Sequence, residues 1–108
     1  MFNLFKKKIS TQDALLISIK SALICYVEEK ESNGLPSTPS RIEYHVRSSS
    51  NLNLSQSDTD LIAFWASRFL YEKNFIEKLA LRALKGPLGT FSKEDELIIE
   101  KIIPEAYK

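Results

Sequence analysis

The stretch from Asp58 to Leu84 constrains the fold most, because it contains neither glycine nor proline and holds the only tryptophan. On a helical wheel of about 3.6 residues per turn, most of its apolar side chains fall on one broad side, as in a helix that faces a core. These residues are Leu61, Ile62, Trp65, Ala66, Phe69, Ile76, Leu79, Ala80 and Ala83. We therefore predict that the rest of the chain packs around this stretch.

Another face of the same stretch gives the one indication of function. Aromatic and cationic side chains follow one another there at spacings of three or four residues, so a continuous helix would align them in one stripe. The stripe consists of Phe64, Arg68, Tyr71, Phe75, Lys78 and Arg82. Such a surface suits a protein partner, or single-stranded nucleic acid that stacks its bases on the rings. The simpler alternative is that the aromatic rings are buried against another helix of a bundle.

The stripe depends on whether the stretch is one helix. Glu72 and Lys73 would project toward the apolar side of an uninterrupted helix, and Asn74 tolerates the left-handed conformation that ends one. The sequence thus allows either one helix or two that meet between Glu72 and Asn74. In the second case the stripe is bent.

Length and composition indicate one ordinary globular domain, residues 1–108. The chain has 108 residues, 44% of them hydrophobic and 27% charged, which is enough to bury a core. The net charge is +1, so binding to nucleic acid or to a membrane would need a local basic patch.

Cys25 is the only cysteine and His45 the only histidine. A lone cysteine excludes an internal disulfide and favours a reducing, cytoplasmic location. Cys25 with His45 as its base would be a nucleophile pair, but a single cysteine on an apolar helix is usually a packing residue. We predict no catalytic residue, no metal site and no cofactor.

The first predicted helix runs from Ser10 to about Ser32, with Ser10 and Asp13 forming a partial capping box. Residues 1–9 form an arm that is either flexible or docked on the domain. Its apolar residues and the lysines Lys6–Lys8 would also allow weak contact with a membrane surface. The apolar run after them is interrupted by charges, so we expect neither a signal peptide nor a spanning helix there.

Residues 39–55 have two interpretations. Thr38 and Pro39 are typical of a helix start, which predicts a short helix from Pro39 to Ser49. Alternation of Ile42, Tyr44 and Val46 with charged residues instead favours a hairpin over residues 41–55, and hence an α+β fold. The serine run between the two halves lacks the chemistry of a tight turn, so we prefer the helix.

Gly86 and Pro87 end the long stretch, and Ser92 begins a last helix from Lys93 to Ile103. The acidic residues 94–96 fit the first turn of that helix better than a cation site, because adjacent carboxylates point in different directions.

The predicted fold is all-α, a compact bundle of four to five helices. A short helix followed by a long one is the order of a helix-turn-helix, but the connection is long and Asp58 and Asp60 would face phosphates. We expect a small, non-enzymatic, intracellular module that binds another protein through the stripe, as inhibitors, immunity proteins and adaptors do. The alternative is a helix-turn-helix-like regulator that binds nucleic acid.

Overall fold

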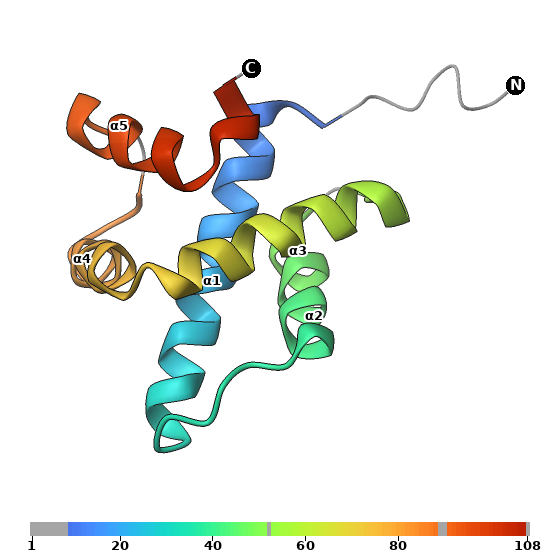
Figure 1. Ribbon diagram of the computed structural model, residues 1–108. Helices are drawn as coiled ribbons and strands as arrows, with labels where there is room; N and C mark the ends of the chain where they lie inside the picture. The colour runs from blue at the N-terminus through green and yellow to red at the C-terminus, as the bar shows by residue number, and fades with distance from the viewer. Residues whose placement is uncertain (1–8, 52, 89–90, 108) are drawn as a thin grey trace, which may run out of the picture.

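Helices form nearly all of the regular structure in the computed structural model, which describes residues 9–51, 53–88 and 91–107. Within those ranges there are five α-helices, a short 3₁₀ helix and no strand. The elements are α1 Thr11–Glu31, α2 Pro39–Ser49, α3 Gln56–Tyr71, α4 Lys73–Ala83, α5 Lys93–Ile102 and the 3₁₀ helix η2 Pro104–Tyr107 (Figure 1). The predicted all-α bundle, packed as a single compact domain, is confirmed.

α1 is the central element, because α2, α3 and α4 all contact it. It begins where predicted, with the Ser10 hydroxyl accepting a hydrogen bond from the Asp13 N–H at 3.1 Å. It ends at a turn in which Asn33 and Gly34 both have positive φ, 59° and 87°. The Gly34 N–H donates to the carbonyl of Glu29 at 2.7 Å, which closes the last turn of α1 and directs the chain toward α2.

The segment with two interpretations is a helix, so the predicted hairpin over residues 41–55 is wrong. The Thr38 hydroxyl accepts a hydrogen bond from the Arg41 N–H, and Pro39 occupies the first turn of α2. Ile42, His45 and Val46 are buried, at the spacing of one helix face. The alternating apolar and polar residues of this segment therefore lie on different sides of a helix, and the apolar side packs on α1 and α3.

The long stretch is two helices, and the break lies at Glu72, whose φ and ψ are −92° and 70°. Figure 1 shows α3 from the side, crossing in front of α1, and α4 nearly along its axis, so the two helices point in different directions. The six predicted stripe residues are thus divided between two helices.

Most of the predicted core of this stretch is buried: Ile62, Trp65, Ala66, Phe69, Ile76 and Leu79. The prediction is wrong for Leu61, whose side chain is 43% exposed on α3, and for Ala83, which is exposed at the end of α4. Leu61 lies at the edge of the predicted apolar side, where burial by neighbouring helices is incomplete.

α5 begins with a complete capping box. The Ser92 hydroxyl accepts from the Asp95 N–H, and the Asp95 carboxylate accepts from the Ser92 N–H. Ile99, Ile102 and Ile103 are buried, and η2 packs against α5. The acidic first turn of α5 therefore has the structural role that the sequence indicated.

Across the described ranges, no helix has the length and apolar character needed to cross a bilayer. Ile9 is half-buried and packs against the core. The rest of the predicted N-terminal arm, with its proposed membrane contact, lies outside the described residues.

Candidate functional site

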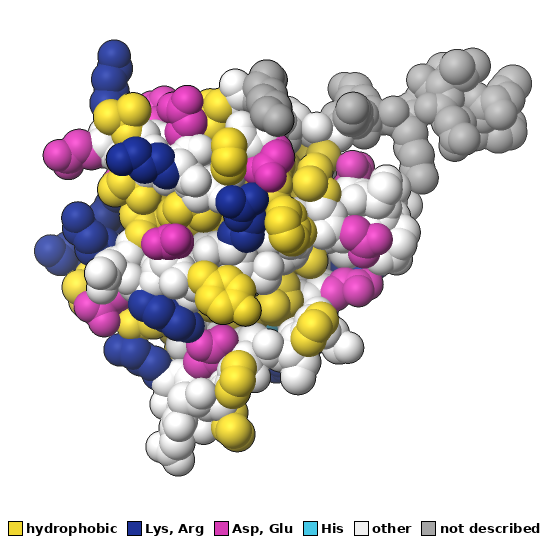
Figure 2. Space-filling model, in the orientation of Figure 1, with side chains coloured by type: hydrophobic (Ala, Val, Ile, Leu, Met, Phe, Trp, Pro, Cys, Tyr) yellow, Lys and Arg dark blue, Asp and Glu magenta, His cyan; other side chains and the backbone are white. Residues whose placement is uncertain are grey.

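The first half of the predicted stripe is exposed on the outward face of α3. Phe64 is 51% exposed and Tyr71 is 85% exposed, the highest fraction among the large apolar and aromatic residues described. Arg68 lies between them, and its guanidinium carbon is 5.5 Å from the centre of the Phe64 ring. With Leu61 these residues form one surface, which we call the α3 face. In Figure 2, hydrophobic side chains are visible over α3 among acidic and basic ones.

Phe75 does not belong to a surface, which corrects the prediction that it contacts a partner. Its side chain is 6% exposed, and its ring centre lies 6.2 Å from that of Phe69 in the core. The turn at Glu72 causes the difference, because it rotates the residues of α4 relative to those of α3. Phe75 is therefore a core residue.

Lys78 and Arg82 are exposed on α4 and do not continue the α3 face. Arg82 forms an ion pair with Asp95 and thereby joins α4 to the first turn of α5. The six stripe residues thus fall into three groups: an exposed set on α3, a buried phenylalanine, and two cations on another helix.

The arginines are already paired within the molecule. Arg41 pairs with Glu28, Arg47 with Glu43, Arg68 with Glu105 and Arg82 with Asp95. These are all four arginines of the sequence. Each would have to exchange a carboxylate for a phosphate in order to bind nucleic acid, which makes a phosphate-binding surface less favourable than the sequence alone indicated.

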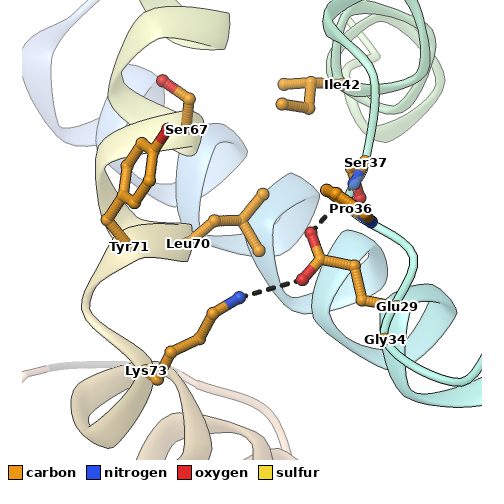
Figure 3. A pocket seen from close by; sticks show the side chains of 9 residues that line it. All are labelled: Glu29, Gly34, Pro36, Ser37, Ile42, Ser67, Leu70, Tyr71 and Lys73. Atoms are coloured by element: carbon orange, nitrogen blue, oxygen red, sulfur yellow. Dashed lines mark hydrogen bonds and ion pairs between the residues drawn. The ribbon is translucent and has the colours of Figure 1, made fainter.

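A pocket of about 340 Å³ lies beside the α3 face, and Tyr71 belongs to both. Figure 3 shows α3 on one side of it and the connection between α1 and α2 on the other. The lining residues are Glu29, Gly34, Pro36, Ser37, Ile42, Ser67, Leu70, Tyr71 and Lys73. Most of this lining is apolar, so the pocket has the size and chemistry to take one bulky apolar side chain of a partner.

Glu29 and Lys73 provide the charged edge of the pocket. The Lys73 ammonium lies 2.9 Å from one Glu29 oxygen, and the Ser37 N–H donates to the other at 3.1 Å (Figure 3). Partial burial raises the pKa of Glu29, but the bonds from Lys73 and Ser37 outweigh it, so the net pKa is lowered. The carboxylate is therefore charged at neutral pH and holds α1, the connection and α4 together.

The pocket was not predicted, because its two charged residues are separated by 44 positions in the sequence. No helical periodicity relates Glu29 to Lys73. Of the lining residues, the sequence had indicated only Tyr71, as an exposed residue of the predicted stripe.

Cys25 and His45 do not form a nucleophile pair among the described contacts. Burial raises the pKa of the Cys25 thiol, which disfavours the reactive thiolate. His45 instead contacts Glu28, with Nε2 3.0 Å from Oε1, although the two groups are poorly aligned for a hydrogen bond. In the described part of the chain, no group of three or more His, Cys, Asp or Glu residues is arranged to hold a metal ion.

Comparisons of this chain with protein-family models, with curated proteins and with solved structures find no match.

Proposed function

We propose that this chain is a small, non-enzymatic protein-binding module of the inhibitor, immunity or adaptor type. It covers a partner protein with the α3 face, formed by Leu61, Phe64, Arg68 and Tyr71. The observation that carries the proposal is the 85% exposure of Tyr71 at the edge of a pocket. Exposed aromatic rings beside a concave apolar site are typical of the residues that contribute most to protein interfaces.

The arrangement supports a mode of binding in which this chain and its partner each insert side chains into the other. Phe64 and Tyr71 project from the domain toward the partner, and the pocket receives an apolar side chain from it. Arg68 is held over the Phe64 ring and by the Glu105 carboxylate, 3.1 Å from its Nη1, so less side-chain freedom is lost on binding. The single cysteine is consistent with a module that works in the cytoplasm.

The test is capture of partner proteins from the source cell with the wild-type chain and with Phe64→Ala, Tyr71→Ala and Arg68→Glu. The proposal expects one specific protein band with the wild type and its loss with each of the three variants. Leu97→Ala is the matched control, because Leu97 is an exposed apolar residue on a different helix, α5.

Arg68→Glu needs a second control, because it also breaks an internal ion pair. Glu105→Ala removes the same pair and keeps Arg68. Retention of the band with Glu105→Ala and its loss with Arg68→Glu would assign the effect to contact with the partner. Retention of the band in all three α3-face variants would reject the proposal.

The nucleic-acid alternative receives less support, since the arginines are paired and the amino-terminal turn of α3 carries Asp58. A filter-binding assay over a range of salt concentrations distinguishes it, because binding through phosphates weakens steeply as salt rises.

A further inference from the structure

One side of α1 is not covered by the rest of the described structure. The opposite side, which carries Ser18, Ala22 and Cys25, is fully buried. The uncovered side nevertheless contains apolar residues: Ile24 is 40% exposed and Val27 is 47% exposed. A helix that is apolar on nearly all sides is normally buried on all sides. We therefore expect another molecule to cover this exposed apolar surface.

Four residues on the uncovered side are spaced symmetrically along α1. Lys20, Ile24, Val27 and Glu31 follow one another at spacings of four, three and four, which places them in one stripe along α1. We call it the α1 stripe. Its centre is apolar, one end is positive and the other is negative.

The two charged ends are exposed and, among the described residues, form no ion pair. They differ in this from all four arginines and from Lys73, each of which is paired with a carboxylate. The charges of the α1 stripe are therefore available to a partner, and the surface that complements the stripe is the same stripe in reverse.

We propose that the α1 stripe binds a second copy of this chain, with the two α1 helices antiparallel about a two-fold axis. Lys20 then faces Glu31 of the partner subunit, and Ile24 faces Val27 of the partner subunit. Because the two-fold axis repeats each contact, the pairing gives two ion pairs around four apolar side chains. The antiparallel arrangement also sets the helix dipoles in opposition, which is favourable.

The surface beside the stripe extends the contact. A groove of about 370 Å³ runs between α1 and the segment that follows α4, and it is lined mostly by apolar residues, among them Leu16, Leu23, Ala83 and Leu88. A stable dimer generally buries about 800 Å² on each subunit, more than one helix stripe supplies. The groove lies alongside Leu23 and adds apolar area toward that requirement.

The test is analytical ultracentrifugation of the whole chain over a wide concentration range. We expect a reversible equilibrium between monomer and dimer. Lys20→Glu and Glu31→Lys each place like charges opposite one another at both ends of the interface, so each variant alone should raise the dissociation constant by about tenfold or more.

The decisive variants restore the pairing. The double variant Lys20→Glu/Glu31→Lys exchanges the charges and should dimerise as the wild type does. An equimolar mixture of the two single variants should form a heterodimer, because each chain supplies the charge that the other needs. Circular dichroism of every variant checks that the fold is retained, and the heterodimer keeps the test valid if the double variant does not fold.

The proposal would be overturned if the chain were a monomer at every concentration, or if neither Lys20→Glu nor Glu31→Lys changed the dissociation constant of the dimer. It would also be overturned if neither the mixture nor the double variant restored association. The α3 face is not part of this surface, so the outcome is independent of partner capture.

Discussion

At the residue scale, two phenylalanines of similar sequence context have different roles. Phe75 is buried beside Phe69, whereas Phe64 is half exposed. We expect Phe75→Ala to lower the free energy of unfolding by about 3–5 kcal/mol, through lost burial and the cavity left behind. Phe64→Ala should lower it by about 1 kcal/mol or less. Urea denaturation followed by Trp65 fluorescence measures both, and equal losses would contradict the assignment.

Glu28 predicts how stability depends on acid. The hydrogen bonds from Arg41, and then the nearby imidazole of His45, lower the pKa of its carboxyl from 4.5 to about 2. Since the folded pKa is below the unfolded value, the stabilisation from Glu28 is present above about pH 4.5 and is lost as the pH falls toward 2. The Tm of the wild type should therefore exceed that of Glu28→Gln at pH 6, and the difference should shrink between pH 4.5 and 2.

Arg41 and Arg47 provide the controls for that measurement. Arg41→Gln removes the main cause of the lowered pKa and should reproduce the pH-dependent loss of Tm. Arg47→Gln removes a similarly exposed cation from the same helix, one that pairs with Glu43 instead. A difference in Tm that stays constant down to pH 2 for Glu28→Gln would show that the carboxylate is not held by these contacts.

At the element scale, α2 depends on its first turn, because it is short and only one face is buried. The Thr38 hydroxyl accepts a hydrogen bond from the Arg41 N–H at 3.1 Å. Thr38→Ala should lower the free energy of unfolding by about 1 kcal/mol. Ser40→Ala, in the same turn and exposed, should be nearly neutral. Chemical denaturation of both variants tests this, and an equal effect would mean that the hydroxyl does not cap α2.

The helix starts could be predicted because capping is local. Ser10, Thr38 and Ser92 each accept a hydrogen bond from the N–H three residues later, so the signal lies within four consecutive residues. The break at Glu72 was only one of two interpretations. Glu72, Lys73 and Asn74 allowed a break, but α4 has no side-chain cap there, so the capping signal that marks the other helix starts is missing.

At the scale of the whole molecule, surfaces were harder to predict than helices. Helical spacing aligned Phe64 and Tyr71, which are exposed on α3, but the same spacing aligned Phe75 with them, and Phe75 is buried. Spacing gives directions relative to one helix axis, and the axis changes at Glu72. The pocket and the uncovered side of α1 depend on which neighbours cover which faces, and that is decided by tertiary packing.

The two proposed surfaces use different helices: the α3 face lies on α3, and the α1 stripe lies on α1, away from its fully buried side. Partner capture and self-association should therefore be separable. Lys20→Glu should shift the protein toward the monomer and leave capture through the α3 face intact. Phe64→Ala should abolish capture and leave the dimer intact. Sedimentation and capture, measured on the same two preparations, test this directly. If either substitution removed both properties while circular dichroism showed an intact fold, the two surfaces would be coupled, and their independence, inferred from their positions on different helices, would be wrong.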